Sequence, residues 1–117
     1  MKKIAILRCL ESNDVCTGAS CLDAFYKRNR YFSIYDEDVQ LVAFFSCNGC
    51  KQRVILKNQI GMDEKLEHLK SMGTEVVHIG ACAWIRTETG EHVICPKIVE
   101  LIKRIEIMEM KVVYGTH

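Results

Sequence analysis

The chain contains seven cysteines in 117 residues, several times what an average domain of this length carries, and an odd number cannot all pair within one chain. Two of them form the motif Cys47-Asn48-Gly49-Cys50, whose spacing allows both sulfurs to reach one tetrahedral metal ion. The same spacing is typical of redox pairs, because a helix N-terminus lowers the pKa of a thiol beside it. The motif therefore predicts a metal site or a thiol-redox pair, with a tight turn carrying incidental cysteines as the third alternative.

A second pattern overlaps this motif. Cys47 and Arg53 are separated by five residues, which resembles the oxyanion loop of low-molecular-weight tyrosine phosphatases and arsenate reductases. Val54 follows the arginine where those enzymes have serine or threonine, so this hypothesis ranks behind the other two. The glycines form no nucleotide-binding loop, and we expect no dinucleotide cofactor.

The elements that must position these cysteines can be inferred from hydrophobic periodicity. Near-continuous apolar runs predict strands buried on both faces of a parallel sheet, and about thirty residues separate successive runs, enough for a helical crossover. The predicted strands are Ile4–Leu7, Val39–Phe45, Val76–Ile79 and Val112–Tyr114. Helical spacing predicts buried stripes at Met62, Leu66 and Leu69, and at Ile98, Leu101, Ile102, Ile105 and Met108.

The helix ends also carry signals. A Ser20-x-x-Asp23 capping pattern is expected to open the first helix, with Leu22, Phe25 and Tyr26 on its buried side. Gly73 is expected to end the second helix, and Cys95 should cap the third, with Pro96 at its first position. Residues 87–91 read as a polar turn between the third strand and the last helix.

These elements predict an α/β chain that forms one domain over residues 1–117. We expect an open four-stranded parallel sheet of order 2-1-3-4 with helices on both faces, a Rossmann-like or flavodoxin-like arrangement. In that topology most of the cysteines meet at the carboxyl edge of the sheet, where open α/β sheets bind ligands. Cys21 is the exception, because it lies inside the first helix.

Four thiols complete a structural zinc site, and more than four are present. The expected ligands are Cys9, Cys47, Cys50 and Cys82, with Cys16, Cys95 and His117 as secondary candidates. Zinc is favoured, and an iron–sulfur cluster is the alternative that the surplus of thiols allows. In the redox alternative Cys47 attacks a substrate and Cys50 resolves the intermediate. A third alternative is a small interaction domain whose cysteines merely pack.

The four histidines are weaker candidates than the cysteines. His78 lies in the third predicted strand, so we expect a buried histidine with satisfied hydrogen bonds. His68 should face solvent on its charged helix. His92 precedes Cys95 by three residues, a spacing that suits a ligand or a surface turn equally.

Taken together, these residues resemble the CGGC-domain family of small cysteine-rich proteins, over nearly the whole chain. The segments that carry the resemblance are Ile6-Leu7-Arg8-Cys9, Cys16 with Gly18, Phe45–Cys50, His78–Cys82, Cys95-Pro96 and Gly115–His117. The family usually has glycine in place of Asn48, and often histidine in place of Lys97. The resemblance implies metal binding, commonly taken to be zinc, and implies no particular reaction.

The net charge and the N-terminal residues limit the classes of partner that we expect for this protein. Sixteen basic and fifteen acidic residues give a formal charge of +1 without a basic run, so we expect no nucleic-acid partner. The apolar run after Lys2-Lys3 is too short for a signal peptide or membrane span, which indicates a cytoplasmic protein that does not bind membranes. Open sheet edges leave pairing with a second copy as an option, and no motif specifies a substrate.

Overall fold

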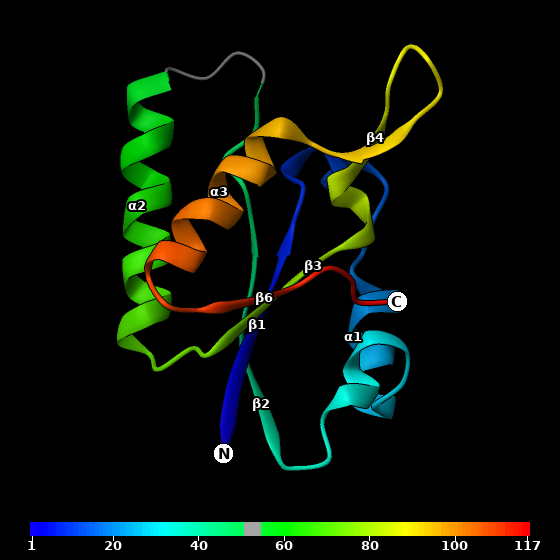
Figure 1. Cartoon of the computed structure of the whole chain (residues 1–117), viewed down its shortest axis with the longest axis vertical. Helices are drawn as coiled ribbons and strands as arrows, with labels where there is room; N and C mark the ends of the chain where they lie inside the picture. The colour runs from blue at the N-terminus through cyan, green and yellow to red at the C-terminus, as the bar shows by residue number, and fades with distance from the viewer. Residues whose placement is uncertain (51–54) are drawn as a thin grey trace.

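A computed structural model describes the backbone of residues 1–50 and 55–117 and the side chains of residues 1–50 and 59–117. Its main feature is a parallel sheet of four strands in the order β2-β1-β3-β6. The strands are β1 (Lys2–Arg8), β2 (Val39–Ser46), β3 (Val76–Ile79) and β6 (Lys111–Val113). The predicted order 2-1-3-4 is confirmed, with β6 as the fourth strand of this sheet (Figure 1).

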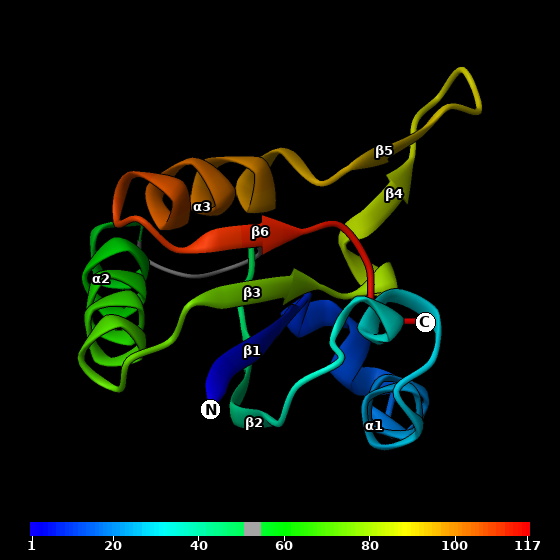
Figure 2. The ribbon, with the colours of Figure 1, turned by 60° about the horizontal axis from the view of Figure 1, so that its bottom comes forward.

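Helices cover both faces of the sheet, as predicted (Figure 2). The helices α2 (Ile55–Ser71) and α3 (Pro96–Ile107) pack on one face, against Ala5 and Leu7 of β1. The helix α1 (Ala19–Lys27) packs on the other, against Ile4 and Ile6. Because successive strand residues point to opposite faces, β1 contributes alternately to two cores. This explains why its apolar run is continuous.

The predicted helical stripes form the core beneath α2 and α3. Met62, Leu66 and Leu69 are buried on α2, and four of the five predicted residues are buried on α3, namely Ile98, Leu101, Ile102 and Ile105. Gly73 follows the end of α2 with a φ of +85°, and the N–H of Thr74 donates to the carbonyl of Leu69. This pattern of helix termination is the one that Gly73 predicted. No helix within the described residues is long and apolar enough to cross a membrane.

Two predictions about α1 are wrong. Its N-cap is Gly18 with a φ of +80°, and no side-chain capping bond forms, so Ser20 and Asp23 do not make the expected capping box. Tyr26 is 76% exposed, because Cys21, Ala24 and Phe25 already define the buried face and Tyr26 lies about 100° beyond Phe25 around the helix. Phe25 is buried as expected.

The connections contain elements that the periodicity did not predict. The described residues include three short 3₁₀ helices, η1 (Leu10–Asp14), η2 (Arg30–Ile34) and η3 (Ala81–Ala83). An antiparallel hairpin of β4 (Trp84–Arg86) and β5 (His92–Ile94) stands apart from the main sheet. The predicted polar turn at residues 87–91 is its tip, closed by a hydrogen bond from the Thr87 N–H to the Glu91 carbonyl at 2.8 Å.

A candidate cysteine site at the carboxyl edge of the sheet

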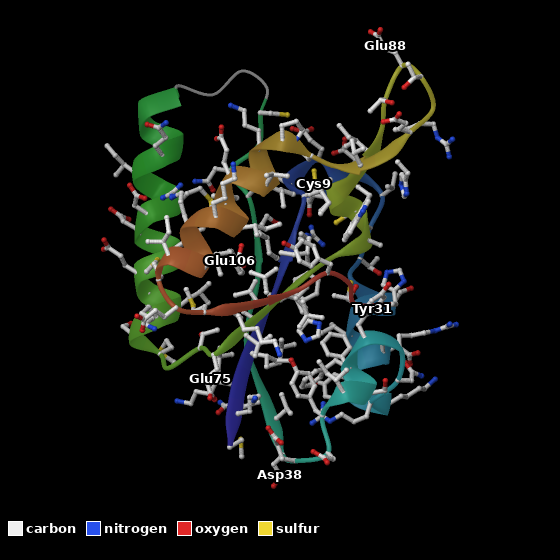
Figure 3. The ribbon with its side chains drawn as sticks, viewed as in Figure 1. Cys9, Tyr31, Asp38, Glu75, Glu88 and Glu106 are labelled. Carbon is white, nitrogen blue, oxygen red and sulfur yellow. The ribbon has the colours of Figure 1, made fainter. Side chains whose placement is uncertain are left out.

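Several cysteines lie at the carboxyl edge of the sheet, just after the ends of its strands, as the topology predicted. Cys9 follows β1, Cys47 follows β2, and Cys82 lies in η3 directly after β3. Cys95 is the N-cap of α3, and its N–H donates to the Ala83 carbonyl at 2.8 Å, which ties the start of that helix to η3. Figure 3 shows Cys9 at the end of the central strand.

Two consecutive backbone amides hold the sulfurs of Cys47 and Cys82. The N–H of Cys9 donates to the Cys82 Sγ at 3.2 Å, and the N–H of Leu10 donates to the Cys47 Sγ at 3.4 Å. Because β1 lies between β2 and β3, the backbone at Cys9 and Leu10 contacts one thiol that follows each neighbouring strand. Amide donors of this kind stabilise a thiolate more than a thiol, because the hydrogen bond is stronger to the charged form.

The thiols at this edge lie close enough for their charges to interact. Burial raises the pKa of the Cys9 thiol, and repulsion from Cys47 and Cys82 raises it further, although backbone hydrogen bonds from Glu11 and Ser12 act in the opposite direction. A cation placed among these sulfurs would relieve the repulsion and lower the pKa again.

The seven cysteines, all within the described residues, are unpaired thiols, and four of them pack in the cores on the two faces of the sheet. Cys9, Cys47 and Cys95 pack with the core beneath α2 and α3. Cys21 belongs to the core beneath α1, where its Sγ lies 3.2 Å from the Thr116 Oγ1. Burial raises the pKa of Cys21, and Cys82 and Cys16 add smaller repulsions. Cys82 therefore lies near both groups of thiols.

The remaining candidates are more exposed. Cys50 and Cys16 are exposed thiols, and the Gly18 N–H donates to the Cys16 Sγ at 3.4 Å. His117 is exposed, at the end of a tail whose Thr116 contacts α1. His68 and His92 are exposed as well. Arg53, which the anion-loop hypothesis requires, lies outside the described residues.

His78 is fully buried, and both ring nitrogens have partners, as the sequence predicted. Its Nε2 lies 2.7 Å from the Tyr35 hydroxyl, and its Nδ1 lies 2.8 Å from the Gly115 carbonyl oxygen. Burial, with repulsion from Glu37, raises the pKa of Tyr35 to about 12, so its hydroxyl keeps the proton that it donates. His78 therefore anchors the C-terminal tail.

The turn of the Cys47–Cys50 motif is fixed by two features. Gly49 has a φ of +82°, a left-handed conformation that glycine adopts without strain. The Lys65 Nζ on α2 donates to the Ser46 carbonyl at 2.9 Å and to the Asn48 Oδ1 at 2.7 Å. Asn48, the residue that departs from the usual glycine, thereby fastens the turn to α2.

A pocket of about 370 Å³ opens beside this turn, between α2 and α3, and sequence reasoning missed it. Cys47 and Cys50 both line it, Met62 and Leu101 supply apolar surface, and Lys97 and Glu100 supply charge. The signal available in the sequence was the pair of charges one turn apart on α3, directly after Cys95-Pro96.

Across the described part of the chain, no three side chains of histidine, cysteine, aspartate or glutamate are placed to hold a metal ion. The ligand set expected from the sequence therefore stays a prediction. Cys9, Cys47 and Cys82 come from neighbouring strand ends, and Cys50 shares the pocket with Cys47.

The fold and the cysteine edge define a class: a small, cysteine-rich α/β protein with thiols at the carboxyl ends of a parallel sheet. The chain belongs to the CGGC domain family, whose pattern matches residues 3–117. It is 35% identical over 124 aligned positions to the uncharacterized protein MJ0582 of Methanocaldococcus jannaschii, covering 98% of this chain and 86% of that protein. No solved structure matches the chain.

Proposed function

We propose that the protein binds a metal ion, zinc in the first instance, through thiolates at the carboxyl edge of the sheet. The observation that carries this proposal is the pair of consecutive amides at Cys9 and Leu10, which donate to the sulfurs of Cys82 and Cys47. The donor set fits a soft or borderline cation, because thiolates are the protein ligands that zinc and iron–sulfur centres share.

The proposed ligands are Cys9, Cys47, Cys50 and Cys82, with Cys16, Cys95 and His117 as secondary candidates. Since no three of the described side chains converge in this conformation, binding requires some thiols to rotate about their Cα–Cβ bonds. Bound zinc would supply a cross-link between strand ends. Burial is the largest cause of the raised pKa of Cys9, and repulsion from Cys47 and Cys82 adds to it. The added repulsion supports the proposal, because ligation would remove it.

The test is metal content, measured by mass spectrometry on protein purified without oxygen or added metal. We expect near-stoichiometric zinc in a colourless protein, and at least tenfold weaker zinc binding for Cys47→Ser or Cys82→Ser. Cys21→Ser is the matched control, since Cys21 packs under α1 beside Thr116, and it should retain zinc. Brown protein containing iron would indicate a cluster instead. Metal-free protein with reactive thiols throughout would contradict the proposal.

A second candidate function is thiol–disulfide exchange by Cys47 and Cys50, and the pocket that both residues line favours it. Cys50 is exposed while Cys47 is 8% exposed. Accessibility therefore favours Cys50 as the attacking thiol and Cys47 as the resolving one, the reverse of the roles that the motif alone suggested. A Cys47→Ser protein that keeps its zinc but loses disulfide-reducing turnover would support exchange, and simultaneous loss of zinc and stability would support the metal proposal.

A further inference from the structure

The pocket beside the Cys47–Cys50 turn combines apolar surface, charged side chains and two thiols. Its volume of about 370 Å³ lies at the lower end of the range for small-molecule sites. Met62 and Leu101, which are 4% and 6% exposed, give it an apolar floor from α2 and α3. An exposed thiol and a buried thiol of the same motif open onto it.

The charges around the pocket divide into a paired set and an unpaired set. Asp63 of α2 and Arg104 of α3 form an ion pair that joins the two helices and neutralises both groups. Lys97 and Glu100 are exposed, lie one turn apart on α3, and have no ion-pair partner among the described side chains. The pocket therefore offers one free cation and one free anion within the described lining, beside two thiols.

We propose that this pocket binds a small disulfide of the amino-acid type, with a carboxylate directed at Lys97 and an ammonium group at Glu100. The disulfide bond then lies against Cys50. This inference rests on the second candidate function, thiol–disulfide exchange, and adds the substrate class to it. An uncharged disulfide would leave both charges without partners, and a singly charged one would satisfy only one of them.

In the proposed exchange reaction, the bound disulfide is the oxidant of the two protein thiols. The Cys50 thiolate attacks one sulfur, the disulfide bond breaks, a mixed disulfide with Cys50 forms, and the first thiolate leaves and takes a proton from water. Cys47 loses its proton to water and attacks the Cys50 Sγ, which releases the second thiolate and leaves a disulfide between Cys47 and Cys50. Two protein thiols are oxidised, and one disulfide is reduced to two thiols.

The test uses reduced, metal-free, full-length protein carrying Cys16→Ser, which removes the other exposed thiol. Four probes vary the charge: cystine has both groups, dithiodipropionate only carboxylates, cystamine only ammonium groups, and hydroxyethyl disulfide neither. The adduct at Cys50 is followed by mass spectrometry in a further Cys47→Ser background, where it accumulates. Thiol release from the chain with Cys47 intact gives a second measurement that does not depend on folding of that variant.

Each rate is compared with the same probe on the parent chain, so intrinsic differences between the probes cancel. We expect Lys97→Ala to slow cystine and dithiodipropionate about three- to fivefold, and Glu100→Ala to slow cystine and cystamine by a similar factor. Hydroxyethyl disulfide should be unaffected by either change. Lys103→Ala and Glu106→Ala are matched controls, since both residues are exposed on α3 and neither lines the pocket.

Three results would overturn the inference. If the control substitutions slow the charged probes as much as the pocket substitutions do, the effect belongs to the general field of the protein. If Cys50 reacts but no probe responds to Lys97→Ala or Glu100→Ala, thiol exchange stands and the proposed substrate class fails. If Cys50 forms no adduct with any probe, exchange and substrate class both fail, while the metal proposal is judged separately by zinc content.

Discussion

His78 shows how a residue that resembles a metal ligand is used for structure instead. Its ring stacks on Phe32 at a centroid distance of 4.3 Å, and both nitrogens are engaged within the core beneath the tail. The Gly115 carbonyl can only accept a hydrogen bond, so Nδ1 carries the proton and Nε2 accepts the proton of the Tyr35 hydroxyl. The neutral ring thus satisfies its neighbours completely, and a protonated ring would not.

This arrangement predicts that the protein loses stability as the pH falls. Burial lowers the pKa of His78 below its ordinary value of 6.5. Below about pH 6.5, His78 becomes protonated in the unfolded chain but stays neutral in the folded protein. The free energy of unfolding therefore decreases, by at most about 1.4 kcal/mol per pH unit, as the pH falls. Urea unfolding between about pH 7.5 and 5.5 measures the slope.

His78→Gln should abolish most of this pH dependence, at a cost in overall stability. The exposed His68→Gln variant should keep the slope of the parent protein. An unchanged slope in His78→Gln would show that another group is responsible.

At the scale of the elements, glycines and caps fix where the helices start and therefore where the thiols lie. Gly18 begins α1 in a left-handed conformation against the ring of Phe44. Cys95 occupies the N-cap of α3 without making a side-chain capping bond. Position 18 is thus constrained both by its backbone conformation and by the contact with Phe44. At position 95, a different side chain could still accept a capping hydrogen bond.

Gly18→Ala should destabilise the protein more than Gly90→Ala. Both glycines have a positive φ, of +80° and +85° respectively. An added Cβ would meet the Phe44 ring at 2.9 Å at position 18, whereas no atom of the described residues lies within 4 Å at position 90. We expect about 1 kcal/mol of strain for Gly90→Ala, and about 2–4 kcal/mol for Gly18→Ala, where overpacking adds to strain. Chemical denaturation measures both, and equal losses would contradict the contribution of Phe44.

Cys95→Ser should stabilise the metal-free protein by about 0.5–1 kcal/mol. A serine hydroxyl at the N-cap accepts a hydrogen bond from the first turn of the helix, which the Cys95 thiol does not do. The melting temperature of the metal-free chain tests this. Zinc content of the same variant decides whether Cys95 is also a ligand, and a large loss of zinc would promote it from its secondary position.

At the scale of the whole molecule, a metal at the carboxyl edge would join strand ends that are distant in sequence. Zinc should therefore stabilise the entire fold. With zinc at about one hundred times its dissociation constant, the gain is about 2.7 kcal/mol, provided that the unfolded chain binds it weakly. Urea unfolding with zinc and with a chelator measures this difference. Cys82→Ser should shrink it, Cys21→Ser should preserve it, and an identical midpoint in zinc and in chelator would contradict a structural metal.

Local sequence determined the strands, the stripes on α2 and α3, and the sheet order, because continuous apolar runs and right-handed crossovers leave few arrangements of such a chain. It also placed Cys21 inside the first helix, apart from the other cysteines, and predicted that His78 is buried with satisfied hydrogen bonds. The hairpin of β4 and β5 was not predicted, because each strand has only three residues and the tip between them is polar.

Tertiary structure alone decided which thiols interact and which are accessible. The amides at Cys9 and Leu10 meet the sulfurs of Cys82 and Cys47 because β1 is central, and no local pattern encodes a contact between residues 73 positions apart. Cys47 is buried in the core beneath α2 and α3, whereas Cys50 is exposed at the pocket between these helices. The sequence alone identified the cysteines as candidate site residues, whereas their burial and their hydrogen bonds depend on how the sheet and helices pack.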